Sequence, residues 1–346
     1  MAEDIGIDLG TATFLIYTKN RGLILKEPSV IAMNRDSRQV RAVGDDAYRM
    51  IGRTPEGIVA VRPVRDGVIS DKVLTEKMIG MFLQKANIGG GGFLGLRGGV
   101  KMMIGVPSNI SDVEKRAVIN AAMQNNARRA YLIEEPLAAA LGAGLKITDP
   151  IGSMIVDIGG GSTDIAVISM GGIVVSESMR VAGDEFDESI MRYLRRRHNV
   201  LIGERTAEEI KIHVGAAMIH DESESVAAEV RGRDLTDGLP KTIAVDTIDV
   251  IEALSDPLTK IVEATRRVLE MTPPELVSDI MDRGIIMTGG GSLLKNFDEL
   301  LRQTTGIPVA VAENAVEAVA IGTGMALDMV GELGDSLVSS DMYIRR

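Results

Sequence analysis

The sequence contains no cysteine, which excludes disulfides, thiolate metal ligands and cysteine nucleophiles. A chain without disulfides needs no oxidising compartment, so we expect it in the cytoplasm. Basic residues are in the minority, with 38 against 49 acidic residues and a formal net charge of −11. No run of basic residues is longer than Arg195-Arg196-Arg197, which we read as a solvated helix face. This charge balance argues against a nucleic-acid partner, because such a protein needs a basic surface.

Long apolar runs are also missing. Nowhere do about 18 apolar residues follow one another without a charge, so no membrane-spanning helix is predicted. The N-terminus lacks the basic segment and apolar stretch of a signal peptide. A hydrophobic fraction of 45% and a charged fraction of 25% are ordinary for a soluble globular protein. The length of 346 residues predicts two domains, since a domain commonly has about 150 residues.

The strongest positive signal is an internal repeat. Residues 5–13 read Ile-Gly-Ile-Asp-Leu-Gly-Thr-Ala-Thr, and residues 155–164 read Ile-Val-Asp-Ile-Gly-Gly-Gly-Ser-Thr-Asp. A second apolar stretch follows each segment, so both predict a β-hairpin. Residues 135–145 and 317–327 also resemble each other and predict helices of small residues that can pack backbone against backbone. Two similar domains with a ligand cleft between them are the simplest account.

Strand and helix signals alternate between the repeated segments. Val100–Val106 predicts a strand, and Ser111 with Glu114 predicts a capping box for a helix over about 112–127. Ile285–Met287 predicts another short, buried strand. Interleaved strands and helices indicate a mixed sheet covered by helices, which is the α/β class.

Both hairpin turns have the composition of a phosphate clamp. Glycine lets backbone N–H groups approach an anion closely, and neighbouring hydroxyls add donors. Asp8 and Asp157 precede the turns at equivalent places, and two carboxylates beside a polyphosphate suit a hydrated magnesium ion. One such turn alone would more simply be a glycine-rich hairpin, but two matching copies favour phosphate binding. The predicted phosphate-binding residues are Gly10, Thr11, Ala12, Thr13, Gly159, Gly160, Gly161, Ser162 and Thr163.

Two further pairs of charged residues each have two interpretations. Glu134 and Glu135 precede Pro136 at a predicted helix start. One of them could polarise a water that attacks a γ-phosphate, but a carboxylate favoured by the helix dipole occupies the same position. Glu208 and Lys211 share a predicted helix face, which suits contacts to ribose and adenine. An ion pair within the helix is the commoner explanation for that spacing.

A glycine-rich segment, Ile88–Gly99, carries the apolar residues Phe93, Leu94 and Leu96. A flexible loop cannot easily bury such side chains, and only 3% of the chain is aromatic. Exposure of a phenylalanine there would therefore need a functional reason. The alternative is that the loop folds back onto its own domain.

Together these segments resemble the superfamily of actin, sugar kinases and heat-shock chaperones. Its five motifs match, in order, Ile5–Thr13, Ile133–Leu145, Val156–Val167, Thr288–Ser292 and Ala315–Leu327. Within the superfamily the sequence is most similar to the MreB family. The segments that carry this similarity are Glu27–Val30, Arg62–Val68, Val181–Asp187 and Thr206–Lys211.

The resemblance implies an actin-like α/β fold, with two duplicated ribonuclease-H-like lobes and ATP in the cleft between them. Each lobe would carry an inserted subdomain, since residues 32–65 and 181–245 depart from the duplicated pattern. The first lobe core would comprise residues 1–31, 66–145 and 328–346. The second lobe core would comprise residues 146–180 and 246–327.

The resemblance also implies roles for individual residues. ATP or ADP would bind with Mg²⁺ near Asp8 and Asp157, and Glu135 would position the hydrolytic water with help from Ser162. The residues implied around the nucleoside are Gly183, Glu208, Glu209, Ile210, Lys211, Gly289, Gly290, Gly291 and Ser292. The family usually has asparagine where Thr13 stands and often has threonine where Ser162 stands. Both residues keep a hydrogen-bonding group, so nucleotide binding is expected to survive.

The resemblance further implies a weak ATPase that polymerises into paired antiparallel filaments. Such filaments lie on the inner face of the cytoplasmic membrane, act with cell-wall elongation proteins and help to set rod shape. Too few residues precede Asp8 for an amphipathic helix, so membrane contact would fall to Phe93, Leu94 and Leu96. A small-molecule kinase of the same fold is the alternative, although no general-base aspartate or acceptor pocket is singled out. A chaperone is disfavoured because the motifs extend to residue 327 and leave no room for a substrate-binding domain.

Overall fold

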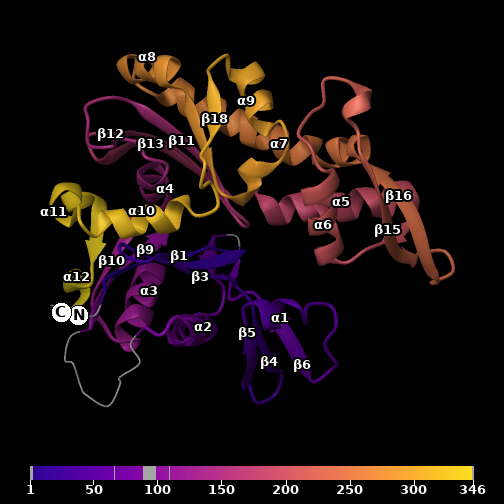
Figure 1. Cartoon of the computed structure of the whole chain (residues 1–346), viewed down its shortest axis with the longest axis horizontal. Helices are drawn as coiled ribbons and strands as arrows, with labels where there is room; N and C mark the ends of the chain where they lie inside the picture. Colours follow the sequence, from indigo (N-terminus) through magenta and orange to yellow (C-terminus); the bar gives the residue numbers. More distant parts are fainter. Residues whose placement is uncertain (1–2, 66, 89–98, 109, 345–346) are drawn as a thin grey trace.

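Two mixed β-sheets form the centres of two lobes, and helices cover both sheets (Figure 1). The computed structural model describes residues 3–65, 67–88, 99–108 and 110–344. Near the end of the chain, β19 (Leu337–Ser339) pairs antiparallel with β10 (Ala127–Glu134). The chain therefore returns at its end to the sheet in which it begins.

The first lobe is built on a six-stranded sheet with the order β19-β10-β9-β1-β2-β3. Its remaining strands are β1 (Ile5–Leu9), β2 (Thr13–Thr18), β3 (Gly22–Pro28) and β9 (Val100–Val106). β1 pairs antiparallel with β2 and parallel with β9, so the first predicted hairpin and the predicted strand over Val100–Val106 are both confirmed. Apolar side chains of α2 (Lys72–Lys85) and α3 (Asp112–Gln124) pack with this sheet into one core.

The predicted capping box at the start of α3 is confirmed. The backbone N–H of Glu114 donates to Ser111 Oγ at 3.4 Å, and the backbone N–H of Ser111 donates to Glu114 Oε2 at 2.9 Å. The helix ends at Gln124, earlier than predicted. Asn126 has a left-handed backbone conformation, with φ of 67°, and this reverses the chain before β10 begins.

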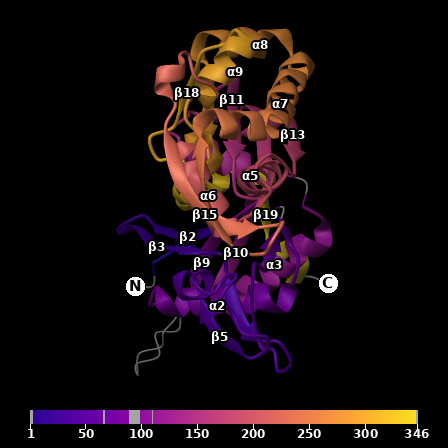
Figure 2. The ribbon, with the colours of Figure 1, turned by 90° about the vertical axis from the view of Figure 1, so that its right-hand side faces the viewer.

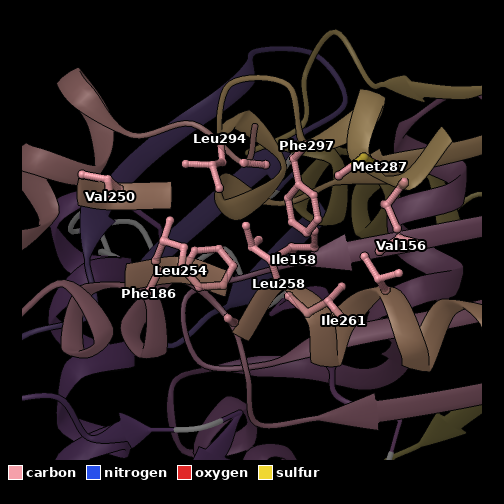
Figure 3. Close-up of a cluster of buried hydrophobic side chains, with 14 of the residues drawn as sticks. Val156, Ile158, Phe186, Val250, Leu254, Leu258, Ile261, Met287, Leu294 and Phe297 are labelled. Carbon is pink, nitrogen blue, oxygen red and sulfur yellow. The ribbon is translucent and has the colours of Figure 1, made fainter. Parts of the chain in front are cut away.

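The second lobe repeats this plan on a five-stranded sheet with the order β13-β12-β11-β17-β18. Its strands are β11 (Ser153–Ile158), β12 (Thr163–Ser169), β13 (Gly172–Met179), β17 (Ile285–Thr288) and β18 (Val309–Val311). The covering helices are α7 (Thr247–Met271), α8 (Pro274–Arg283) and α9 (Phe297–Thr305), which Figure 2 shows at the end of the molecule opposite α2. Leu258 and Ile261 of α7 meet Phe297 of α9 over Val156 of the sheet (Figure 3).

Two helices of small residues join the lobes, as the repeat predicted. α4 (Glu135–Gly142) packs directly against α10 (Ala318–Ala326). A Cβ atom added at Gly142 would lie 1.8 Å from the carbonyl oxygen of Ala318, and one added at Gly322 would lie 1.7 Å from that of Ala138. Only glycine permits this separation of the two backbones, because any side chain would overlap the facing helix.

Each lobe carries a small three-stranded sheet beside its main one. What we call the first insertion comprises β4 (Ile31–Asn34), β5 (Val40–Val43), α1 (Asp45–Tyr48) and β6 (Ile58–Val61). The second insertion comprises α5 (Gly183–His198), β14 (Val200–Leu201), α6 (Glu204–Val214), β15 (Ala227–Asp234) and β16 (Pro240–Asp246). Figure 1 shows both insertions on the same side of the molecule, with α6 above α1.

Short elements complete the fold. They are β7 (Val64–Arg65), β8 (Val68–Ile69), α11 (Val330–Leu333), α12 (Asp341–Ile344) and the 3-10 turns Glu222–Glu224, Gly290–Leu293 and Gly334–Ser336. Within the described residues, none of the helices combines the length and the apolar character needed to cross a membrane.

Candidate functional site

A cavity of about 430 Å³ opens between the two lobes. Its floor and walls come from both hairpin turns, from α4, α5 and α6, and from the segments that follow β17 and β18. Elements far apart in the sequence thus meet at one place, as the internal repeat predicted. The size and position of the cavity are typical of a small-ligand site between domains.

The two hairpin turns face each other across this cavity at very short range. A Cβ atom added at Gly160 would lie 2.5 Å from the Cβ of Ala12, so glycine is required for this approach. The first turn is fixed by Ser29, whose Oγ donates to the carbonyl of Gly10 at 2.6 Å and whose N–H donates to that of Ala12 at 2.9 Å. The second turn is fixed by backbone N–H groups at the start of α5.

The carboxylates of Asp8, Asp157 and Glu135 line the cavity, and that of Asp164 is buried next to Asp157, its partner across β11 and β12. Burial raises the pKa of Asp8 to about 8, and the nearby charge of Asp157 adds to this. Burial, with the charge of Asp164, raises the pKa of Asp157 to about 7, although Thr288 opposes this rise by donating from Oγ1 at 3.0 Å. Burial also raises the pKa of Asp164 to about 6. The pKa of Glu135 lies well above its ordinary value for the same reason, and all three aspartates contribute.

In the described part of the chain, no three acidic or histidine side chains are arranged to hold a metal ion by themselves. The carboxyl groups of Asp8, Asp157 and Glu135 therefore form an acidic floor and not a closed metal cage. Such a floor attracts a cation that brings further ligands of its own.

The opposite wall of the cavity carries the predicted nucleoside residues. Lys211 Nζ lies 2.9 Å and 3.0 Å from the two carboxylate oxygens of Asp187 and donates to the carbonyl of Gly183 at 3.1 Å. Burial raises the pKa of Asp187 to about 7, although the charge of Lys211 opposes this rise. Glu208 accepts a hydrogen bond from Tyr48 of the first insertion. Glu208 and Lys211 thus bind partners from other elements, and not each other.

Most of the predicted site residues line this single cavity. They are Asp8, Gly10, Thr11, Ala12, Thr13, Glu135, Asp157, Gly159, Gly160, Gly161, Ser162, Gly183, Glu208, Lys211, Gly289, Gly290 and Gly291. Phe93, Leu94 and Leu96 lie outside the described residues.

Four predicted nucleotide-binding residues do not line the cavity. Thr163 is buried and donates from its hydroxyl to the carbonyl of Val181 at 2.6 Å, and Ser292 donates to the carbonyl of Gly289 at 2.7 Å. Ile210 packs in the core of the second lobe, and Glu209 is exposed to solvent. The helical turn explains the last two, because only positions 208, 211, 212 and 215 of this segment face the cavity.

The prediction missed several residues that line the cavity. Asp184, Phe186 and Asp187 belong to the segment Val181–Asp187, which carried the family resemblance and so offered a signal for them. The segments that carried the resemblance also contain Leu9, Gly67, Ala315, Val316 and Val319. The missed residues outside every such segment are Ile212, Gly215, Leu293, Leu294 and Lys295.

Comparison with solved structures defines the class of protein. The crystal structure of MreB5 of Spiroplasma citri bound to AMPPNP superposes with a TM-score of 0.89 at 34% identity, covering 96% of this chain and 98% of that one. The duplicated lobes and the cavity between paired hairpins are those of an actin-like protein, so the predicted fold is confirmed.

Sequence comparison gives the family. The chain is 51% identical to the cell shape-determining protein Mbl of Bacillus subtilis (strain 168) over 332 residues, which cover 96% of this chain and 98% of Mbl. It is 48% identical to the cell shape-determining protein MreB of Escherichia coli (strain K12) over 344 residues, covering 98% and 97%. The family model described as MreB/Mbl protein matches residues 2–335. The chain belongs to the MreB/Mbl family, as its motifs indicated.

Proposed function

We propose that this chain binds ATP or ADP with Mg²⁺ in the interlobe cavity and hydrolyses ATP slowly. We further propose that it polymerises into membrane-associated filaments that help to determine cell shape. The observation that carries the proposal is the pair of facing glycine turns above Asp8 and Asp157. A solved relative of the same family was crystallised with AMPPNP, which supports a nucleotide as the ligand.

The phosphate end of the nucleotide would lie between the two turns. Backbone N–H groups of residues 10–13 and 159–162 would donate to phosphate oxygens, together with the hydroxyls of Thr11, Thr13 and Ser162. The separation of the turns allows both to contact one polyphosphate. Asp8 and Asp157 would hold hydrated Mg²⁺, which commonly binds through one or two carboxylates plus phosphate oxygens. Their raised pKa values support this, since a cation would relieve the repulsion between them.

Hydrolysis would depend on Glu135 at the first position of α4. Its buried carboxyl lines the cavity beside the two aspartates, where it can orient the attacking water and accept its proton. The hydroxyl of Ser162 would support this water from the second turn. A bound cation would lower the raised pKa of Glu135 and thus favour the ionised form.

The nucleoside would lie along α5 and α6. Glu208 and Lys211 would contact it from one wall, and the turn Gly289–Gly291 from the other. Thr163 and Ser292 would act indirectly, because their hydroxyls hold the backbone next to the cavity.

Relatives named as cell shape-determining proteins support a role in shape. We propose that the chain assembles with itself into paired antiparallel filaments on the inner face of the cytoplasmic membrane, where they organise cell-wall elongation proteins. Phe93, Leu94 and Leu96 are the proposed membrane contacts. Each of these side chains would contribute about 1.5–3 kcal/mol if fully buried in lipid, and repetition along a filament would multiply the effect.

One set of samples tests the proposal. Protein with ATP, ADP or no nucleotide is mixed with liposomes, and phosphate release, pelleting and negative-stain images are recorded. Glu135→Gln should keep ATP binding but slow phosphate release by about 100-fold or more. The neighbouring change Glu134→Gln is the matched control, because Glu134 does not line the cavity. Phe93→Ser/Leu94→Ser should leave filaments intact but detach them from lipid.

Two results would contradict the proposal. Equal phosphate release by Glu135→Gln and wild type would remove Glu135 from catalysis. Nucleotide-bound protein that stays monomeric across lipids, salts and concentrations would exclude the filament and favour a small-molecule kinase of the same fold.

A further inference from the structure

The two insertions are connected by an aromatic side chain that contacts Glu208, a residue of the cavity wall. Tyr48, the last residue of α1, donates a hydrogen bond from its hydroxyl to Glu208 Oε2 on α6. The guanidinium of Arg205, one turn earlier on α6, lies over the Tyr48 ring at 5.2 Å from its centroid. Both contacts join the first lobe to the second, and Figure 1 shows α1 and α6 next to each other there.

A second contact lies beside the first. Arg62 follows β6 and approaches Glu204 at the start of α6, with 3.5 Å between Nη2 and Oε1. The same guanidinium donates from Nη1 to the carbonyl of Ala12 at 3.5 Å, within the first phosphate turn. The Arg62 side chain is only 11% exposed, against 49% for Glu204. The connection between the insertions thus extends to the phosphate end of the cavity.

Glu208 has two roles in this arrangement, because it also lines the cavity. Its Oε2 atom is engaged by Tyr48, and no described residue donates a hydrogen bond to Oε1. A carboxylate can accept several hydrogen bonds, so Oε1 can receive one from a ligand while Oε2 keeps the tyrosine. Burial and the neighbouring Glu208 raise the pKa of Tyr48 well above its ordinary value, so the phenol remains a donor at physiological pH.

We propose that Tyr48 is a positioning residue for nucleoside recognition, acting from the opposite lobe. By holding Oε2 of Glu208, it directs Oε1 toward the ribose hydroxyls of a nucleotide in the cavity. Ribose binding and the contact between the insertions then stabilise each other, since coupling of two equilibria is reciprocal. The inference rests on the proposed function, in which Glu208 contacts the nucleoside.

The chain offers a matched control for a tyrosine that bonds to carboxylates. Tyr193 in α5 donates to Asp249 Oδ1 at 3.0 Å and to Glu252 Oε2 at 2.7 Å. Its pKa is also raised, by burial and by these two acceptors, yet it does not line the cavity. Tyr193→Phe therefore removes the same chemistry from the lobe that carries Glu208, without touching the proposed ribose site.

The test measures equilibrium binding of ATP and of 2′,3′-dideoxy-ATP, each with Mg²⁺, by competition against a fluorescent nucleotide. Wild type, Tyr48→Phe, Glu208→Ala, the double variant and Tyr193→Phe are compared. Tyr48→Phe keeps the ring beneath Arg205 and removes only the hydroxyl. We expect it to lower the affinity for ATP by about five- to tenfold. The affinity for the dideoxy analogue should stay within about twofold of the wild-type value. The same change should have no further effect on ATP affinity once Glu208 is Ala, because alanine offers the Tyr48 hydroxyl no acceptor.

The outcomes separate this inference from the proposed function. If Tyr48→Phe lowers the affinity for both nucleotides equally, or for neither, the positioning role is overturned. ATP binding by the wild type would still support the proposed function in that case. A wild-type protein that binds neither nucleotide overturns both. Thermal unfolding of each variant is recorded, and the expected selectivity change must appear in protein that melts like wild type.

Discussion

The two phosphate turns arise from one repeated sequence, but they are held in place by different means. The first turn is held largely by side chains, through Ser29 Oγ on the carbonyl of Gly10 and through Thr11 Oγ1, which accepts from the N–H of Gly67 at 3.1 Å. The second is held mainly by backbone, as the N–H groups of Gly183 and Asp184 donate to the carbonyls of residues 159 and 160 at 3.1 Å and 2.8 Å. A side chain contributes through the Thr163 hydroxyl, which donates to the carbonyl of Val181 at 2.6 Å.

The two lobes thus connect their insertions to the turns of the cavity in different ways. Ser29 directly precedes the first insertion and Arg62 directly follows it, so a movement of that insertion acts on the first turn through side chains. The second insertion begins with α5 itself, whose first N–H groups bind the second turn. We therefore expect side-chain truncation to weaken the first turn, and added bulk to disrupt the second.

The largest expected effect is that of Gly160→Ala. The new Cβ would lie 2.5 Å from the Cβ of Ala12 and 3.1 Å from its nitrogen, so the turns must separate. Overpacking of this kind costs about 1–3 kcal/mol, which corresponds to a loss of nucleotide affinity of up to about 100-fold. Isothermal titration calorimetry with Mg·ATP measures this affinity. Gly203→Ala is the control, since nothing lies within 4 Å of a Cβ there. Equal affinities in both variants would show that the turns do not act together.

Sequence reasoning identified the turns because their chemistry is local. Glycine, hydroxyl and aspartate recur at matching positions in the two repeats, and the small residues of α4 and α10 show where two backbones can meet. Ser29 and Gly67 could not be identified in this way. Their roles depend on which carbonyl or hydroxyl they contact after folding, and the residues next to them in the sequence do not indicate that partner.

The same limit applies to the predicted nucleoside residues of α6. The spacing of Glu208 and Lys211 was compatible with an ion pair within the helix, but each finds a stronger partner in tertiary structure, Tyr48 and Asp187 respectively. The contiguous assignment of residues 208–211 also ignored helical periodicity, which places Glu209 in solvent and Ile210 in the core.

An effect of intermediate size is expected from the raised pKa values of Asp8 and Asp157, as a pH dependence of stability measured without nucleotide or Mg²⁺. Their folded pKa values, about 8 for Asp8 and about 7 for Asp157, lie above the ordinary value of 3.8. The folded state then binds more protons than the unfolded state, so stability must fall as pH rises. Between pH 6 and 7 we expect a loss of about 2 kcal/mol in the free energy of unfolding, measured by urea titration.

Two additions sharpen this experiment. Saturating Mg·ATP should abolish most of the pH dependence, because the cation then stabilises the ionised forms of Asp8 and Asp157. Without the cation, the nearby carboxylates of Asp164 and Glu135 disfavour ionisation by charge repulsion. Thr288→Val removes the hydroxyl that lowers the pKa of Asp157, so the pKa of Asp157 should rise toward that of Asp8. Stability that is constant or higher at pH 7 in the nucleotide-free protein would contradict the account of the floor.

The smallest expected effect comes from the side-chain tether of the first turn. Ser29 is fully buried, and Ser29→Ala leaves the carbonyl of Gly10 without its 2.6 Å donor. A lost hydrogen bond of this type costs about 1 kcal/mol, so we expect Mg·ATP affinity to fall about fivefold. Ser336→Ala is the matched control, because Ser336 Oγ donates to the carbonyl of Gly171 at 2.9 Å in a turn outside the cavity. Both variants should lose similar stability, but only Ser29→Ala should weaken nucleotide binding. If binding is unchanged in both, the main-chain bond from Ser29 to Ala12 is sufficient, and the first turn is held mainly by backbone like the second.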